Sequence, residues 1–266
     1  MPNKTNLSIP ISIVIAGFLI AGAVFYNGNG NKDGGSQVNL PTAQLPVDTI
    51  INIKPISDND YILGNPNASV KIVEFSDLEC PFCKRFHSTL QQIMDEYGKD
   101  GKVAWVYRHF PLAQLHSKAT KEAEATECAF DQGGNTAFWE YTDKVYEITP
   151  SNDGLDLDLL PEIAEGLGLD RAVFEECLDN RDNKEKVAGH LKDAFATGGR
   201  GTPHSIMTLK EAISNEEKAL IEASFPRANV NVSNDKKRIS VSGALPFEMI
   251  SQLLQIVIGD AADSAE

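Results

Sequence analysis

The hydrophobic pattern of this chain is clearest between residues 70 and 108. Residues 70–76 are mostly β-branched and aromatic, which is typical of a buried strand. Hydrophobic side chains then recur at helical spacing over residues 81–97, and a second strand is predicted over residues 102–108. A strand, a helix and a strand in this order predict a βαβ unit with parallel strands.

The rest of the body is predicted to be helical first and then to return to strands. We expect helices over residues 113–132, about 136–147, 158–166, 170–179 and 182–197, strands over residues 204–209 and 238–242, and a last helix over residues 246–258. The segment 113–187 is therefore predicted to be an all-helical insertion, with Phe138, Trp139 and Phe174 in its core. Residues 211–223 fit a short helix and a mobile surface loop equally well.

The N-terminal segment has a different pattern. Ile9 to Tyr26 is an apolar run of about 18 residues, near the lower limit for crossing a bilayer. Lys4 precedes it, which favours a cytoplasmic start over residues 1–7 and an external body. We favour an uncleaved transmembrane anchor over residues 8–26. The alternative is a signal peptide cleaved after Ala21-Gly22-Ala23.

Composition adds three expectations. Residues 27–59 are rich first in Gly and Asn and then in Pro and polar residues, which predicts a flexible tether. The net charge of −14 argues against a nucleic-acid partner, because such binding needs a basic surface. Four cysteines in an exported chain fit an oxidising compartment.

The main candidate chemistry lies in Cys80-Pro81-Phe82-Cys83, between the first strand and its helix. Cys80 is predicted to lie at the helix N-terminus, where unpaired amides and the helix dipole favour a thiolate. Cys83 lies one turn further on, where it can attack a mixed disulfide formed at Cys80. This setting favours a redox-active pair.

A cysteine pair with this spacing has three other possible roles. A structural zinc site needs four ligands, and the cysteine pair supplies two. His87, in Cys83-x-x-x-His87, offers a third ligand, but no fourth is visible. Cys128 and Cys177 lack the spacing of a zinc knuckle. Covalent haem attachment fails because Lys84, and not histidine, follows Cys83. A purely structural disulfide across this short loop is disfavoured by the strand–turn–helix setting. We therefore expect no metal and no cofactor.

The segment Ile72 to Cys83 resembles the active-site segment of DsbA-like thiol–disulfide oxidoreductases of the thioredoxin superfamily. Further resemblances follow in order along the chain, at residues 108–112, His116 to Cys128, 138–141, 166–170, 201–203 and 242–246. The resemblance implies a thioredoxin-like mixed α/β sheet flanked by helices. Residues 60–112 and 188–262 would form this domain around the insertion 113–187, with 263–266 as a tail.

Two features depart from the family pattern. Pro81-Phe82 stands where the strong oxidants of the family carry Pro-His. Residues 210–237 also lengthen a hairpin that is usually short. The resemblance therefore says more about the fold than about the direction of electron flow.

Glu74 and the Thr202-Pro203 loop complete the expected active site. Strand alternation places Glu74 on the face of Val70 and Ile72, where burial raises the pKa of a carboxyl. The resemblance implies that Glu74 handles the proton of Cys83; the alternative is a strand-end glutamate that reaches solvent. It also implies a cis Thr202-Pro203 bond across from the cysteines, the alternative being an ordinary trans turn.

Charged residues surround the predicted site. Lys84, Arg85 and His87 are expected to favour the Cys80 thiolate, and Asp77 and Glu79 to oppose it. A solvated rim without any tuning role is an equal alternative. For His204 we expect no chemical role.

The other two cysteines are predicted to form a structural disulfide. Cys128 ends an Ala-rich helix, and Cys177 lies beside Phe174 and Leu178 on the face that this helix should meet. Two buried free thiols are the alternative.

Together these features predict an extracytoplasmic thiol–disulfide oxidoreductase that acts on exported proteins and is reset by a membrane redox partner. The helix at residues 8–26 would hold it to the membrane. A reductase or isomerase of the same fold is one alternative, because Phe82 removes a group that could stabilise the thiolate. A non-catalytic module that binds partners is another, although the intact cysteine pair argues against it.

Overall fold

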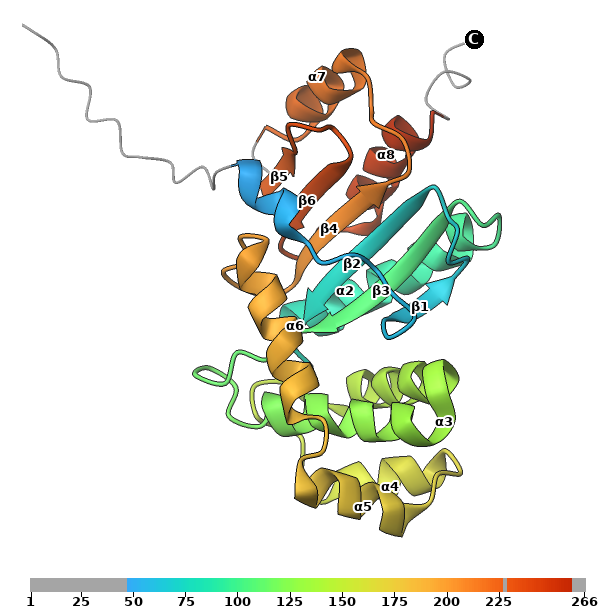
Figure 1. Cartoon of the computed structure of the whole chain (residues 1–266), viewed down its shortest axis with the longest axis vertical. Helices are drawn as coiled ribbons and strands as arrows, with labels where there is room; N and C mark the ends of the chain where they lie inside the picture. Colours follow the sequence, from blue (N-terminus) through green and yellow to red (C-terminus); the bar gives the residue numbers. More distant parts are fainter. Residues whose placement is uncertain (1–46, 227–228, 260–266) are drawn as a thin grey trace, which may run out of the picture. The chain divides into compact units, whose positions relative to one another are not determined.

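A computed structural model describes residues 47–226 and 229–259. Its centre is a six-stranded mixed sheet in the order β1-β3-β2-β4-β6-β5 (Figure 1). β2 and β3 are parallel, and the other neighbouring pairs are antiparallel. The strands are β1 (Tyr61–Gly64), β2 (Val70–Ser76), β3 (Val103–His109), β4 (His204–Leu209), β5 (Asn229–Val232) and β6 (Arg238–Ser242).

The helices match the predicted pattern closely in their order. The α-helices are α2 (Pro81–Ile93), α3 (Ala119–Ile148), α4 (Leu159–Gly166), α5 (Arg171–Asn180), α6 (Lys184–Ala196), α7 (Asn215–Ser224) and α8 (Phe247–Ile258). A 3-10 helix, η1 (Val47–Asn52), precedes the sheet, and α2 continues into a π-helical turn, η2 (Met94–Gly98).

The alternation of side chains along β2 divides the core into two parts. Val70 and Ile72 face the larger part, which includes side chains of α2, α8 and the helical insertion. Val73 and Phe75 face the smaller part, with side chains of α6 and residues 50 and 53. The sheet is thus covered on both faces, and Glu74 points toward the larger part of the core.

The insertion packs α3 against α4 and α5 (Figure 1). Phe138, Trp139 and Phe174 are buried in its core, as predicted. The predicted Cys128–Cys177 disulfide is present and joins α3 to α5, with Cα atoms 5.9 Å apart.

Three differences from the predicted elements have simple local causes. The helix expected from residue 113 begins only at Ala119, because the preceding turn is held by Asp77, which accepts hydrogen bonds from the Leu112 amide and the His116 ring. The helices expected over residues 113–132 and 136–147 form one element, α3, with non-helical backbone at Gly134 (φ 64°). The prediction missed β1 and β5, two strands of four residues at the sheet edges, because runs this short give little alternation.

Residues 47–59 are more ordered than the predicted tether. η1 forms here, and Ile50 and Ile53 are buried against the sheet. The Lys54 amide donates a hydrogen bond to the Asp193 carboxylate (3.1 Å). Two isoleucines can therefore dock a segment whose Pro-rich and polar composition predicted a flexible coil.

The extended hairpin contains α7, so the helix alternative for residues 211–223 is correct. The Ser214 hydroxyl and the Glu217 carboxylate cap it reciprocally. Within residues 47–226 and 229–259, no helix combines the length and hydropathy needed to cross a bilayer. The segment 8–26, predicted as an anchor, and residues 263–266, predicted as a tail, lie outside the described residues.

Replacing Cys128 and Cys177 together by alanine should lower the free energy of unfolding by about 2–4 kcal/mol, because the disulfide restricts the unfolded chain. Urea unfolding of the double variant, followed by circular dichroism, measures the change. Dithiothreitol should lower the wild-type midpoint more than that of the variant, which has no Cys128–Cys177 disulfide to lose. An unchanged midpoint in the double variant would show that the disulfide does not stabilise the insertion.

Candidate functional site

Cys80 and Cys83 lie where β2 gives way to α2. Cys80 is the N-cap residue of α2, and Pro81 occupies the first helical turn, where its missing amide hydrogen costs nothing. Both cysteines are free thiols, and Cys80 is 5% exposed. The Cys80 thiol donates to the Thr202 carbonyl oxygen at 3.6 Å, so the predicted cis Thr202-Pro203 bond does lie across from the cysteines.

The two sulfurs have opposite acidities although they are one helical turn apart. A hydrogen bond from the Cys83 thiol is the main cause that lowers the pKa of Cys80 from 9.0 to about 6; Thr202 and the amides of Phe82 and Cys83 add to it against the effect of burial. Burial raises the pKa of Cys83 well above its usual value, and the neighbouring Cys80 raises it further. At neutral pH this pair therefore has one thiolate, at Cys80, and one thiol, at Cys83.

Glu74 is fully buried, as the alternation of β2 predicted. Burial raises the pKa of this carboxyl from 4.5 to about 7, although hydrogen bonds from Ser76 and Trp105 oppose the shift. Ser76 Oγ donates to Oε1 at 2.7 Å and Trp105 Nε1 donates to Oε2 at 3.0 Å. A carboxyl with a pKa near 7 can both accept and give a proton at neutral pH.

Hydroxyl groups continue from Glu74 into the helical insertion. The Ser76 hydroxyl lies 2.9 Å from the hydroxyl of Tyr146, which in turn lies 3.4 Å from the Tyr107 hydroxyl. The Cys83 sulfur accepts a hydrogen bond from the Asp77 amide at 3.5 Å. Ser76 thus connects the buried carboxyl of Glu74 to Tyr146 of the insertion.

Asp77 fixes the loop that carries Cys80. Its carboxylate accepts hydrogen bonds from the amides of Glu79 (2.9 Å) and Leu112 (2.8 Å) and from His116 Nδ1 (2.9 Å). Burial lowers the pKa of His116, but the hydrogen bond and charge of Asp77 outweigh it, so the net direction is upward. Asp77 thus connects the active-site loop to the segment before α3.

Glu79 and Glu122 form a buried acidic pair beneath the same loop. Glu79 accepts from the amides of Gly154 (3.2 Å) and Leu155 (3.3 Å). Burial and the nearby charge of Glu79 raise the pKa of Glu122 to about 10. Glu122 is therefore protonated at neutral pH, and neither of its carboxyl oxygens has a hydrogen-bond partner among the described residues.

The cations predicted to favour the Cys80 thiolate contact other groups. Lys84 Nζ donates to the Thr149 carbonyl oxygen (2.6 Å), and the Arg85 guanidinium lies 5.2 Å from the centroid of the Phe82 ring. His87 is buried and pairs with Asp143 (2.7 Å). Backbone amides, Thr202 and the second thiol stabilise the thiolate instead. Phe82 itself is 54% exposed.

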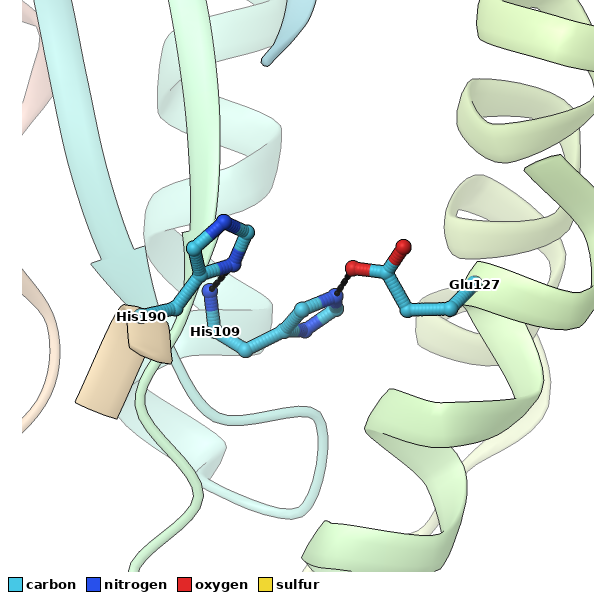
Figure 2. Close-up of side chains that lie close together, drawn as sticks. All are labelled: His109, Glu127 and His190. Atoms are coloured by element: carbon cyan, nitrogen blue, oxygen red, sulfur yellow. Dashed lines mark hydrogen bonds and ion pairs between the residues drawn. The ribbon is translucent and has the colours of Figure 1, made fainter. Parts of the chain in front are cut away.

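Among the described residues, a second polar cluster has the spacing of metal ligands. Figure 2 shows His109, Glu127 and His190, whose ligand atoms lie within 4.8 Å of one another. Glu127 accepts hydrogen bonds from Tyr61, His109 and Lys186, and His190 Nδ1 accepts the His109 amide (3.3 Å). Because Lys186 already neutralises Glu127, these residues fit a structural ion-pair network better than a metal site.

His204 is buried, and burial lowers its pKa to about 4, so it is neutral at physiological pH. Its Nδ1 lies 3.1 Å from the Ser242 hydroxyl. This contact joins β4 to β6.

Three residues of this site were not predicted from the sequence: Ser76, Trp105 and Tyr146. Ser76 could have been found, since it lies two positions after Glu74 and strand alternation points both to the same face. Trp105 follows from the parallel pairing of β2 and β3, in which it pairs with Ile72. Tyr146 comes from the far end of α3, and no sequence pattern connects it to Glu74.

Comparison with known proteins gives a consistent result. A family model described as thioredoxin matches residues 57–222. DsbA1 of Wolbachia pipientis superposes with a TM-score of 0.59 at 22% identity, over 80% of this chain and 96% of that one. DsbA2 of Pseudomonas aeruginosa superposes with a TM-score of 0.55 at 24% identity, over 80% of this chain and 100% of that one. Oxidised BdbD of Bacillus subtilis superposes with a TM-score of 0.57 at 18% identity, over 77% of this chain and 96% of that one. Both share the same fold.

Curated relatives match a part of the chain. The Na⁺/H⁺ antiporter NhaA 1 of Mycolicibacterium gilvum is 32% identical over 154 residues, which is 57% of this chain and 24% of the antiporter. The Na⁺/H⁺ antiporter NhaA 3 of Salinispora tropica is 33% identical over 157 residues, which is 59% of this chain and 22% of the antiporter. The chain spans about a quarter of the length of these relatives, so their transport activity is not carried over. The chain belongs to the thioredoxin family and has the fold of the DsbA-type thiol–disulfide oxidoreductases.

Proposed function

We propose that this protein forms or exchanges disulfides in exported proteins through Cys80 and Cys83. The observation that carries the proposal is the split acidity of the two thiols: the pKa of Cys80 is lowered to about 6, whereas that of Cys83 is raised. A thiolate is the nucleophile in disulfide exchange, and a buried thiol that keeps its proton does not compete with it.

The reaction conserves electrons and protons. A substrate thiolate attacks Cys80 Sγ of the Cys80–Cys83 disulfide, the S–S bond breaks, and Cys83 leaves with the electron pair and takes up a proton. A second substrate thiolate then attacks the substrate sulfur of the mixed disulfide and releases Cys80 as a thiolate. The substrate loses two electrons and the protein gains them. Glu74 supplies the proton for Cys83, and the backbone of Thr202 pairs with the extended substrate chain.

A soluble fragment that starts at residue 45 tests the activity. An oxidase should refold reduced ribonuclease, whereas a reductase or isomerase should reduce insulin or reshuffle scrambled ribonuclease. The Cys80→Ser variant is the control and should be inactive in every assay. Absence of activity in all assays would favour a module that only binds partners.

The direction of electron flow follows from the reduction potential of the pair, which titration against glutathione measures. We further propose that the domain lies on the extracytoplasmic side of the membrane, that residues 8–26 anchor it as a single span, and that a membrane redox partner resets it. The apolar run and Lys4 support this placement.

Iodoacetamide should label Cys80 of the reduced protein long before Cys83 at pH 7. The labelling rate of Cys80 should be constant above about pH 7 and fall about tenfold per pH unit below about pH 5, because only the thiolate reacts and the pKa of Cys80 is about 6. Quenched labelling with peptide mass spectrometry measures both rates. Equal rates for the two cysteines would contradict the assignment of Cys80 as the nucleophile.

Glu74→Gln should change how stability depends on pH. The folded pKa of Glu74 is raised from 4.5 to about 7, so its contribution is fully present below pH 4.5 and is lost as the pH rises through 7. At pH 8 the variant should be more stable than wild type by about 3 kcal/mol, and at pH 4 the two should agree. Urea unfolding of the reduced proteins at both pH values measures this, and a difference independent of pH would refute it.

Phe82→His should lower the pKa of Cys80 and raise the reduction potential by about 30 mV for each pKa unit, because imidazole can donate a hydrogen bond to the thiolate. Phe82 is 54% exposed, so the substitution loses little packing. Equilibration with glutathione buffers measures the potential, with Phe82→Leu as the apolar control. If the histidine and leucine variants have the same reduction potential, the residue at position 82 does not set the potential of the cysteine pair.

The native protein should keep Ile9 to Tyr26 and sediment with membranes after a carbonate wash. N-terminal peptide mass spectrometry of the purified protein decides this. A mature N-terminus near Val24 would show instead that the segment is a cleaved signal peptide.

A further inference from the structure

We propose that the backbone amide of Asp77 stabilises the negative charge that develops on Cys83 Sγ during disulfide exchange, and that His116 positions this amide. The proposal rests on the proposed function, because it concerns the step in which Cys83 reacts. The Asp77 amide is a catalytic group in this assignment, since it contacts a reacting sulfur. His116 is a positioning residue, since it acts through the Asp77 carboxylate.

The first observation is the contact between the Asp77 amide and the second sulfur of the pair. The Asp77 N–H donates a hydrogen bond to Cys83 Sγ over an N–S distance of 3.5 Å. Cys83 is completely buried and Asp77 is 1% exposed, so bulk water has little access to this contact. Burial disfavours a charged sulfur, and a donor that is already in place therefore favours the states in which Cys83 carries charge.

The second observation is that the segment after β3 holds the Asp77 amide in place. The carbonyl oxygen of Ser76, in the same peptide unit, accepts a hydrogen bond from the Phe110 amide at 2.7 Å. Asp77 Oδ2 accepts from the Leu112 amide (2.8 Å) and from His116 Nδ1 (2.9 Å). The other described donors to this carboxylate are backbone amides, so His116 is the side chain whose removal tests the arrangement.

His116 also has a possible direct effect on the nucleophile. Its side chain lies in the turn before α3 and is 9% exposed. Burial lowers the pKa of His116, but the hydrogen bond with Asp77 and the charges of Asp77 and Cys80 raise it overall. The rival explanation is therefore that the charge of His116 acts on the Cys80 thiolate. Such an effect would change the step in which Cys80 attacks, and not the step in which Cys83 reacts.

The step that involves Cys83 balances in both directions. When a glutathione thiolate attacks Cys80 Sγ of the protein disulfide, a new S–S bond forms and the Cys80–Cys83 bond breaks. Cys83 Sγ leaves with the electron pair, and the Asp77 N–H stabilises its charge until Glu74 supplies a proton. In reverse, Cys83 loses this proton to Glu74, attacks Cys80 Sγ of the mixed disulfide and expels glutathione as a thiolate.

The Asp77 amide keeps its own hydrogen throughout this step. At neutral pH Cys83 is a disulfide sulfur on one side of the step and a protonated thiol on the other. The hydrogen bond to a charged sulfur is therefore strongest in the transition state. Its loss should slow both directions by the same factor and leave the equilibrium constant of the step unchanged.

The test follows this step in both directions at pH 7. Reduced protein is mixed with oxidised glutathione, and oxidised protein with reduced glutathione; acid quenching and mass spectrometry detect the mixed disulfide at Cys80. His116→Ala should slow the step about threefold in each direction. A hydrogen bond to a full thiolate changes its stability by at least about tenfold, and the reacting sulfur carries about half of that charge in the transition state.

Two further variants serve as controls. His116→Asn is the conservative variant, because its side-chain amide nitrogen can take the place of Nδ1 but carries no charge. It should restore the wild-type rates in both directions. Leu115→Ala lies in the same turn, at a side chain that is 72% exposed, and should change neither rate. In all three variants, the attack of Cys80 on oxidised glutathione should keep its wild-type rate.

The outcomes separate the positioning role from its rivals. Wild-type rates in His116→Ala, or rates in His116→Asn as low as those of the alanine variant, would overturn the role of His116. A change confined to the attack of Cys80 would show that His116 acts through its charge, and an equal loss in both steps would indicate a loss of structure. Either result would contradict the proposal.

Circular dichroism shows whether the variants fold. If His116→Ala does not fold, His116→Asn decides alone: wild-type rates support the positioning role, and a slower Cys83 step contradicts it. A wild-type protein that forms no mixed disulfide with glutathione would instead overturn the proposed function.

Discussion

The site depends on a difference in solvation between two sulfurs only three residues apart. Cys80 lies at the open end of α2, where amides and the Thr202 loop can stabilise negative charge. Cys83 lies one turn inside the helix and is completely buried. Burial disfavours a charged sulfur and so keeps Cys83 protonated. The burial of Cys83 in the core is therefore as important for the chemistry as the backbone amides that stabilise the Cys80 thiolate.

Buried polar groups keep this arrangement in place. Asp77 ties the Cys80 loop to Leu112 and His116, and the Glu79 carboxylate ties it to the amides of residues 154 and 155. On the other face of the sheet, Arg108 pairs with Asp60 and Asp193 and joins β3 to α6. Breaking one partner of such a pair leaves an uncompensated buried charge, so these contacts specify one position for the loop.

The sequence was sufficient where the pattern was local. β2, β4, β6 and most helices have strong periodicity, and Glu74 and the Cys128–Cys177 disulfide follow from the faces on which those residues lie. The sequence alone did not predict the features that depend on tertiary contacts. The docking of residues 47–59 depends on Asp193, and the position of Tyr146 near Ser76 depends on how α3 packs against the sheet. The position of the Lys84 ammonium is set by the Thr149 carbonyl, a partner far away in the sequence, whereas Arg85 lies over the neighbouring Phe82 ring.

The position of Trp105 has an optical consequence. The chain has two tryptophans, and the centroids of the Trp105 and Trp139 rings lie 4.6 Å apart. The Trp105 indole donates directly to Glu74, and Trp139 packs beside it. The tryptophan fluorescence of the protein therefore originates at one place, beside the buried Glu74 carboxyl. A change in the charge of Glu74 alters the electric field at the Trp105 indole. The tryptophan emission therefore reports the protonation state of Glu74 during turnover.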